Sequence, residues 1–213
     1  VYNTDYVDEP IDSWTALWDT KYNKNVILLD GVRDTLGATL KMLGYSLNTT
    51  NPDEINEAKE KLIELKKNGN LLAIGADDNT DKMARGEAAI SILWSGEGLN
   101  LEAEHDNLKF VVPKEGANFW IDSLCIPKGT KNKENAELFI NYLCEKDPSF
   151  RTADEIGYTT PQKEAREEQD DNVKNNPNAY MDDELLKKCE SYNYLGDNLR
   201  LYEDAWTQFK DYQ

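Results

Sequence analysis

Short runs of apolar residues alternate along the chain with longer segments in which apolar positions recur every three or four residues. The runs are Val26–Leu29, Leu71–Ile74 and Ala88–Trp94, and such runs are typical of strands that are buried on both faces. The segments 33–43 and 52–67 have the period of a helix with one buried face. Strands that alternate with helices in this order predict an α/β fold with a parallel sheet.

The helix over 52–67 has clear signals at both ends. Asn51 suits the N-cap, Pro52 suits the first helical position, and acidic residues follow in the first turn. Asn68 and Gly69 are typical of a helix end. The apolar face expected for this helix consists of Ile55, Ala58, Leu62 and Leu65.

Helices are also expected near both ends of the chain. Trp14, Leu17 and Trp18 fall on one face of a short helix, so we expect these side chains in the core. Further helices are expected over about 182–190 and 197–210. The inward residues of the last helix should be Tyr202, Ala205, Trp206 and Phe209.

The middle of the chain combines two predicted helices with a polar stretch. Helices are expected over about 133–144 and 148–157, the second of which ends at a glycine. The stretch 162–178 is charged and contains proline, so we expect a surface connection with little regular structure. Brief strands are expected at Phe110–Val112 and Phe119–Ser123.

Two of the apolar runs end in an indole, at Trp94 and Trp120. Asp122 follows Trp120 by two residues, and side chains that are two apart on a strand point the same way. A flat aromatic ring beside a carboxylate suits an organic ammonium group, which gains a cation–π attraction and a charge-assisted hydrogen bond. The alternative is that both tryptophans are core residues whose indole N–H groups are hydrogen-bonded.

The chain is strongly acidic, with 41 acidic and 24 basic residues and a formal charge of -17. A field of this sign repels nucleic acid and anionic lipid and attracts cations. Nucleic acid is therefore not expected as a partner. The alternative interpretation of the acidity is solubility alone.

The residues available for catalysis or metal binding are few. The only histidine, His105, lies in a polar turn, and the three cysteines have no metal-binding spacing. We therefore expect buried free thiols, no metal and no cofactor. No nucleophile motif, P-loop or dinucleotide fingerprint occurs. The enzyme class that this composition leaves open is a glycoside hydrolase with paired carboxylates, and no catalytic residue is assigned.

Carbohydrate stacking competes with ammonium binding for the same tryptophans. A polycation needs several carboxylates, whereas a neutral sugar is bound through amides, arginine and few acids. Acidic residues follow the predicted strands at Asp30, Asp34 and Glu97, and Asp122 adds another. The acids favour a polycation.

Five motifs occur in order along nearly the whole chain and together carry a family resemblance. They are Ser13-Trp14 to Leu17-Trp18-Asp19, Leu43-Gly44-Tyr45-Ser46 with Asn48-Thr49-Thr50, Gly86-Glu87 to Leu93-Trp94-Ser95-Gly96, Pro113-Lys114-Glu115-Gly116 to Phe119-Trp120-Ile121-Asp122-Ser123, and Ile156-Gly157-Tyr158-Thr159-Thr160-Pro161. With these motifs the chain resembles the spermidine/putrescine-binding proteins of bacterial polyamine ABC transporters. The resemblance implies a periplasmic binding protein type II fold, with two lobes and a polyamine bound between them.

The resemblance also implies the ligand residues. Trp94, Trp120 and Tyr158 match the family's aromatic cage, and Asp122 matches its main ammonium-binding carboxylate. Asp34 stands where the family has a glutamate. Gly31 stands where the family tends to have another acid, and Tyr192 falls near a family glutamine that reaches the ligand.

The implied function is transport without a chemical reaction. The chain would be an extracytoplasmic solute-binding component, periplasmic or lipid-anchored at the cell surface, which passes a polyamine to a membrane permease. An oligosaccharide-binding or ferric-binding relative of the same fold is the other member of this class to consider.

Family members have a longer segment before the position of Val1, and this segment forms most of their first lobe. Residues 1–121 and 166–213 are therefore expected to build the second lobe, and residues 122–165 to belong to the incomplete first lobe. Apolar surface from Phe139, Ile140 and Leu143 would then be exposed. A dimer or a domain swap through this segment is expected.

Overall fold

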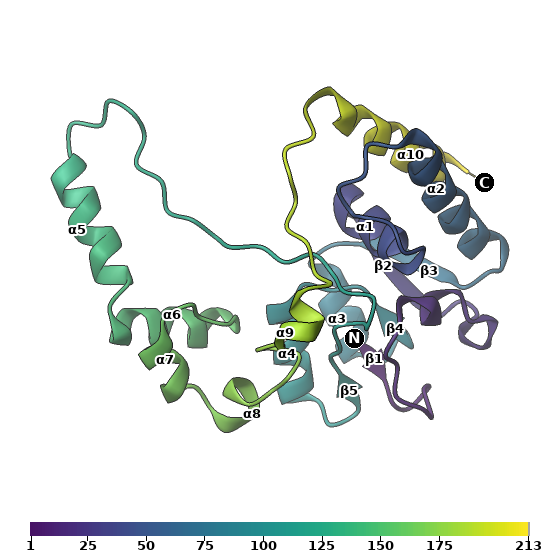
Figure 1. Ribbon diagram of the computed structural model, residues 1–213. Coiled ribbons are helices and arrows are strands. Elements are labelled where there is room, and N and C mark those ends of the chain that lie inside the picture. The colour runs from purple at the N-terminus through teal and green to yellow at the C-terminus, as the bar shows by residue number, and fades with distance from the viewer. Residues whose placement is uncertain (213) are drawn as a thin grey trace. The chain divides into compact units, whose positions relative to one another are not determined.

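The computed structural model describes residues 1–212 and divides into two compact units. We call Val1–Phe119, together with the chain from Asp182 onward, the sheet unit, and Trp120–Met181 the helical unit. Both units are drawn in Figure 1. Residues 166–181 group with the helical unit. The assignment of the units to the two lobes of a binding protein stays a prediction.

The sheet unit contains one five-stranded mixed sheet with the order β3-β2-β4-β1-β5. Its strands are β1 (Tyr2–Asn3), β2 (Val26–Leu29), β3 (Leu71–Gly75), β4 (Ile90–Ser91) and β5 (Leu108–Lys109). β2 is parallel to both β3 and β4, whereas β1 is antiparallel to β4 and β5. The parallel arrangement expected for the predicted strands therefore holds at β3, β2 and β4 and not across the whole sheet.

Helices pack in two groups around these strands. Helices α1 (Val32–Met42), α2 (Pro52–Lys67) and α10 (Leu199–Asp211) contact one another, and α1 also contacts β2. Helices α3 (Asp78–Ala84) and α4 (Ser95–Glu104) contact each other and, respectively, β4 and β5. Figure 1 shows the two groups on opposite sides of the strands. This is the α/β architecture that the alternating pattern predicted.

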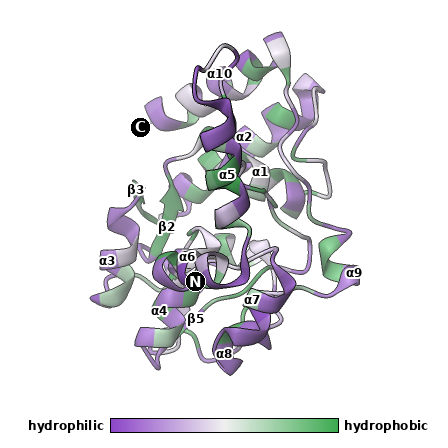
Figure 2. Ribbon diagram, turned by 90° about the vertical axis from the view of Figure 1, so that its left-hand side faces the viewer, coloured by the Kyte–Doolittle hydropathy of each residue, from purple (hydrophilic) through white to green (hydrophobic). Residues whose placement is uncertain are grey.

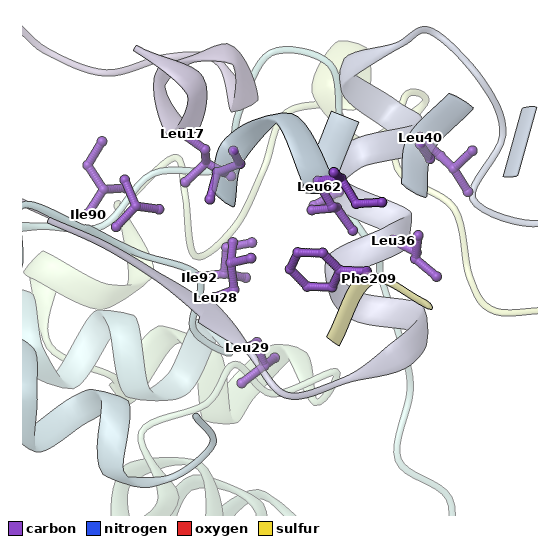
Figure 3. Close-up of a cluster of buried hydrophobic side chains, with 14 of the residues drawn as sticks. Leu17, Leu28, Leu29, Leu36, Leu40, Leu62, Ile90, Ile92 and Phe209 are labelled. Carbon is purple, nitrogen blue, oxygen red and sulfur yellow. The ribbon is translucent and has the colours of Figure 1, made fainter. Parts of the chain in front are cut away.

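The hydrophobic core of the sheet unit lies between the sheet and the α1, α2, α10 group, as Figure 3 shows. All residues of β2 are buried, which confirms the strand predicted from four consecutive apolar residues. The predicted inward residues of α10 are buried as well, and the predicted face of α2 lies in the same core. Full burial of each large side chain stabilises the fold by roughly 1.5–3 kcal/mol.

The predicted boundaries of α2 are confirmed by its capping geometry. The Asn51 side chain accepts a hydrogen bond from the Asp53 amide at 3.0 Å, and Pro52 is the first helical residue. The helix ends at Lys67, and Gly69 has a φ of 76°. This left-handed conformation favours glycine because it has no Cβ atom.

The segment with the first two tryptophans forms the 3-10 helices η1 (Trp14–Trp18) and η2 (Thr20–Tyr22). Leu17 is buried, as predicted, and both indoles of η1 are partly buried against the same core. Trp14 donates its indole N–H to the Gly116 carbonyl at 2.8 Å. Trp18 donates to the Lys61 carbonyl at 2.7 Å.

The helical unit contains α5 (Lys133–Leu143), α6 (Lys146–Ile156), α7 (Lys163–Glu168) and α8 (Asp171–Lys174). The prediction of little regular structure over 162–178 was wrong. The Gln162 side chain caps α7 by accepting from the Ala165 amide at 2.6 Å. The Arg166 guanidinium lies 3.8 Å from the ring centroid of Tyr180 and donates to the Lys174 carbonyl. These local contacts stabilise short helices that a polar composition does not indicate.

Several predicted strands and turns also differ from the structure. Residues Phe119–Ser123 form no strand in the described chain, although Phe119 donates its amide to the Glu190 carbonyl at 3.0 Å. The strand predicted at Phe110–Val112 lies two residues earlier, as β5. The strand predicted over 88–94 is reduced to β4, since its later residues lead into α4. Glu97, which follows this predicted strand, lies in the first turn of α4.

The last part of the sheet unit contains one short helix and one 3-10 helix before α10. The helix predicted over 182–190 is shorter, as α9 (Asp183–Leu186), and the 3-10 helix η3 (Gly196–Asn198) precedes α10. None of the helices within residues 1–212 combines the length and the apolar character that a membrane span requires.

Candidate functional site

Acidic residues gather where three neighbouring parallel strands end. β3, β2 and β4 are adjacent and parallel, so the residues that follow them lie along the same edge of the sheet. We call this the acidic edge, and it consists of Asp77 after β3, Asp30 and Asp34 after β2, and Trp94 and Glu97 after β4. Two of the predicted site residues, Asp34 and Trp94, therefore belong to one edge of the sheet unit.

Asp34 lies in the first turn of α1 and is half-buried. Its Oδ1 atom accepts a hydrogen bond from the Tyr192 hydroxyl at 3.1 Å. Burial raises the pKa of Asp34, and this effect is opposed by the Tyr192 hydrogen bond and by the charge of Arg33. The result is a half-buried carboxylate with a raised pKa close to the end of a strand, and a cationic ligand would offset the cost of its burial.

Gly31, the N-cap of α1, leaves room for this carboxylate. A Cβ atom at position 31 would lie 2.1 Å from Oδ2 of Asp34. A side chain at position 31 therefore requires the Asp34 side chain to move. The family resemblance implies another acid at this position, and here the carboxyl group of Asp34 occupies that space.

Tyr192, which the resemblance placed only near a ligand residue, contacts the Asp34 carboxylate directly. Burial and the neighbouring Asp34 charge raise the pKa of Tyr192 far above its ordinary value. The phenol therefore stays protonated and acts as a hydrogen-bond donor at physiological pH. Tyr192 and Asp34 are 158 positions apart in the chain.

Trp94 and Glu97 form the start of α4. Trp94 is the N-cap residue, and its ring is partly buried against the core. The alternative interpretation of Trp94 as a core residue therefore accounts for part of its surface. Burial raises the pKa of Glu97, the nearby charge of Asp77 raises it further, and a hydrogen bond from the Trp94 backbone opposes both. Oε2 of Glu97 is buried and has no hydrogen-bond partner within the described chain.

Asp30 already has a cationic partner. Lys210, on α10, places its Nζ atom 3.0 Å from Oδ1 and 3.2 Å from Oδ2 of this carboxylate. Both side chains are 42% exposed, so the pair is worth little stability. Asp30 was one of the acids expected to receive a polycation, and the lysine ammonium holds that place.

The helical unit carries the other three predicted site residues. The rings of Trp120 and Tyr158 lie edge to face, with centroids 6.0 Å apart and an interplanar angle of 71°. Trp120 is 36% exposed and Asp122 is exposed. The strand that was to align Trp120 with Asp122 is not formed. The convergence of these groups with Trp94 on one cation stays a prediction.

The cysteines are not part of this site, and their exposure differs from the prediction. All three cysteines are free, but Cys125 and Cys144 are exposed and Cys189 is partly buried. The prediction of buried thiols was wrong, because Cys125 and Cys144 lie in the helical unit, where few side chains are covered. Within residues 1–212 no cluster of His, Cys, Asp and Glu is arranged to hold a metal ion.

A cavity of about 50 Å³ lies in the sheet unit away from the acidic edge. Its lining is mainly apolar and includes Trp14, Leu17 and Phe110. A typical site for an organic ligand has roughly 300–1,000 Å³. At about 50 Å³ this cavity is too small for a typical organic ligand.

The model of the bacterial extracellular solute-binding protein family matches residues 1–181. The chain belongs to this family. The α/β class and the type II periplasmic binding protein fold predicted from the sequence are thereby confirmed for this family member.

Relatives of known function agree with the resemblance that the sequence motifs indicated. The spermidine/putrescine-binding periplasmic protein of Salmonella typhimurium is 36% identical over 209 residues, which are 98% of this chain and 60% of the relative. The Escherichia coli protein of the same name is 35% identical with the same coverage. The resemblance stated from the motifs is confirmed. The chain spans about three fifths of the length of these relatives.

Solved structures of the family agree with the fold. The spermidine/putrescine ABC transporter substrate-binding protein PotD from Streptococcus pneumoniae is 36% identical and superposes with a TM-score of 0.90 over 99% of this chain and 65% of its own. The lipoprotein TpPotD of Treponema pallidum has a TM-score of 0.83 at 23% identity, over 98% of this chain and 64% of its own. At that identity the second likeness concerns the fold alone.

Two basic residues that act on the acidic edge, Lys210 at Asp30 and Arg33 at Asp34, were missed by sequence reasoning. Lys210 gave no signal, because a lysine near the end of a helix is ordinary. Arg33 did give one. A basic residue in the first turn of α1 opposes the helix dipole, and such a local inconsistency often marks a functional position.

Proposed function

We propose that this chain is part of the extracytoplasmic solute-binding component of an ABC importer and that it binds polyamines such as spermidine and putrescine. The observation that carries the proposal is the half-buried Asp34 carboxylate, held by Tyr192, at the same sheet edge as Trp94. The relatives from Salmonella typhimurium and Escherichia coli are spermidine/putrescine-binding periplasmic proteins, which supports the same ligand class.

Each predicted residue has a physical role in holding an extended dication or trication. The rings of Trp94, Trp120 and Tyr158 would stack on its methylene groups and attract its ammonium groups, by roughly 0.5–2 kcal/mol for each ring. Asp122 would pair with one ammonium and Asp34 with another. The net charge of -17 would raise the local concentration of such a ligand.

The proposal includes the place and the partners of the protein. It lies outside the cytoplasm, in the periplasm or lipid-anchored at the cell surface, and delivers its ligand to a membrane permease. It makes and breaks no bond, so it is not an enzyme. The sheet unit would correspond to the second lobe and the helical unit to the part of the first lobe that this chain contains.

Calorimetric titration of the chain with putrescine, spermidine and maltose tests this function. The same titrations are run on a chimera in which the preceding segment of the Salmonella typhimurium relative is joined before Val1. We expect spermidine or putrescine to bind the chimera and to bind this chain more weakly, because part of the ligand's surface stays in water. Equal affinities would contradict the need for the added segment. Binding of maltose alone would overturn the polyamine assignment in favour of a sugar-binding relative.

Asp122→Asn in the chimera separates a polycation site from a sugar site. The substitution keeps the shape and removes the charge, so polyamine affinity should fall about tenfold to a hundredfold, as expected for the loss of a charged hydrogen bond. Asp154→Asn, at an exposed position of α6 in the same unit, is the matched control. Unchanged polyamine affinity in Asp122→Asn would contradict the assigned role.

We further propose that the helical unit associates with a second copy of the chain, as a dimer or a domain swap. Helix α5 has no buried residue, and its large side chains Leu138, Phe139 and Tyr142 are 67%, 58% and 52% exposed. Figure 2 shows hydrophobic residues along α5. Exposed apolar side chains in one cluster favour association.

A further inference from the structure

Arg33 has an environment unlike that of the other basic residues described. Its guanidinium carbon lies 4.5 Å from the ring centroid of Tyr192 and 4.9 Å from that of Tyr202. An arginine next to aromatic faces gains cation–π and stacking energy. The guanidinium is thus held against two tyrosine rings of the C-terminal segment, although Arg33 itself belongs to α1.

Hydrogen bonds fix the guanidinium in this position. Its NH2 group donates to the Leu47 carbonyl at 3.0 Å and to Oδ1 of Asn48 at 2.9 Å. Within residues 1–212, no carboxylate forms a salt bridge with Arg33. Uncompensated charge is costly to bury, so the rings and carbonyl oxygens carry the interaction that a carboxylate ordinarily supplies.

Tyr202 and Asn48 form further hydrogen bonds around the Arg33 guanidinium and the Tyr192 backbone. The Tyr202 hydroxyl is buried and donates to the carbonyl oxygens of Leu47 and Thr49, at 3.2 and 2.8 Å. Asn48 donates its Nδ2 to the Ser191 carbonyl at 2.8 Å and accepts from the Asn193 amide at 2.8 Å. The backbone on both sides of Tyr192 is therefore fixed by Asn48, and the ring of Tyr192 is fixed by Arg33.

The Tyr192 ring that Arg33 holds also donates a hydrogen bond from its hydroxyl to the Asp34 carboxylate. We propose that Arg33 is a positioning residue for cation binding: it holds the Tyr192 ring so that the phenol orients the Asp34 carboxylate toward the ligand. The inference rests on the proposed function. It adds a residue that acts through Tyr192 and does not touch the ligand.

A cation site is better served when Arg33 acts on Asp34 through Tyr192 than when it pairs with Asp34 directly. A guanidinium that paired with Asp34 would neutralise the charge that an ammonium group needs. The phenol donates to Oδ1 of Asp34 without adding a charge. Arg33 and Tyr192 are the charged and titratable groups that act on Asp34, and both hold its pKa down against burial.

Arg33→Lys tests the inference because lysine keeps the positive charge and lacks the planar face. In the chimera described above, Arg33→Lys and Tyr192→Phe should each weaken spermidine binding about tenfold, the size of one charged hydrogen bond. In the double variant Arg33→Lys should add less than about twofold, because its effect passes through the missing hydroxyl. Arg85→Lys, at an exposed arginine of the sheet unit, should leave the affinity unchanged.

A titration of the Asp34 carboxyl by NMR provides a readout that a purely structural role would not move. In Arg33→Lys and in Tyr192→Phe the pKa of Asp34 should rise, because the phenol no longer stabilises the charged form. In Arg85→Lys it should not change. The measurement is made on the 213-residue chain without ligand, so it does not depend on polyamine binding.

The outcomes separate the inference from the proposed function. Additive losses in the double variant, or an Asp34 pKa that is unchanged in Arg33→Lys, would overturn the positioning role. A parent protein that binds no polyamine, but whose Asp34 pKa rises as stated, would overturn the ligand and keep the positioning of the carboxylate. If Arg33→Lys unfolds, Tyr192→Phe decides through the same pKa, because it removes a single oxygen atom.

Discussion

The two units use the same kinds of side chain in opposite ways. Phe209 of α10 is fully buried in the sheet unit, whereas Phe139 of α5 is 58% exposed in the helical unit. β2 is buried along its whole length, but α5 has no buried residue. Both helices have an apolar stripe, so amphipathicity alone does not produce a core. A helix needs a partner surface, and α10 has one within this chain.

This difference extends to the predicted ligand groups. Asp34 is held by Tyr192, whose backbone and ring are both fixed by neighbours in the sheet unit. In the helical unit the Trp120 ring meets Tyr158, while Asp122 stands exposed on a segment without strand partners. In the proposed site, the sheet unit would therefore supply groups that its own contacts already hold in place. The helical unit would supply groups that this chain leaves largely exposed.

The largest expected effect comes from truncating the two phenylalanines in turn. Phe209→Ala should lower the free energy of unfolding by about 3–5 kcal/mol, because it leaves a cavity in the core. Phe139→Ala should lower it by less than about 1 kcal/mol, because the ring is mostly in water. Urea denaturation monitored by circular dichroism measures both. Similar losses for the two variants would show that α5 is covered in solution.

A pair of glycines offers a second comparison. Gly116 and Gly129 have φ values of 87° and 89°, so an alanine at either position costs about 1–2 kcal/mol in backbone strain. A Cβ at Gly116 would also lie 2.3 Å from the Lys188 carbonyl oxygen, whereas nothing lies within 4 Å at Gly129. Gly116→Ala should therefore destabilise the protein by at least about 1 kcal/mol more. Equal thermal shifts would contradict this close approach.

A charge placed on the exposed apolar side of α5 tests whether the chain associates through this helix. Phe139→Asp should abolish concentration-dependent association, because burial of a carboxylate in an apolar contact is unfavourable. Asn135→Asp adds the same charge to another exposed position of α5 and should leave association unchanged. Light scattering after gel filtration at several concentrations gives the mass. A monomer at all concentrations in the parent chain would contradict the proposed dimer.

The smallest effect concerns the pH dependence of stability. Burial raises the pKa of Asp34, so above that pKa the folded protein carries a carboxylate charge that is less favourable there than in the unfolded chain. Asp34→Asn should stabilise the chain at pH 7 by less than about 1 kcal/mol, and the gain should disappear as the pH falls through the raised pKa.

Replacement of Asp78, in the same unit, should change the stability at pH 7 in the opposite direction. Lys82 lowers the pKa of Asp78, so Asp78→Asn should reduce stability at pH 7, and this loss should disappear as the pH falls through the lowered pKa. Thermal denaturation between pH 3 and 8, within roughly the range where carboxylates titrate, compares the two variants. The same sign for both would contradict the assigned causes.

The sequence predicted those parts of the protein that depend on local patterns. The buried strand β2, the capped helix α2 and the inward face of α10 follow from apolar spacing and end signals that lie within each segment. The family resemblance, the fold class and the exposure of Phe139 on α5 were likewise readable from the residues, whereas Ile140 and Leu143, which were also expected to be exposed, are partly buried. One failure was the set of short helices after Gln162, whose stability comes from side chains such as Arg166 and Tyr180 that meet only after folding.

The tertiary structure alone decided which distant residues act together. β1 has two residues and no pattern, and its place in the sheet is set by pairing with β4 and β5. Tyr192 meets Asp34 because Asn48 and Arg33 hold the C-terminal segment against α1. Apolar periodicity encodes which face of an element is buried, and this is a local property. The contacts of single polar side chains depend on where the folded backbone brings them, and no local pattern records that.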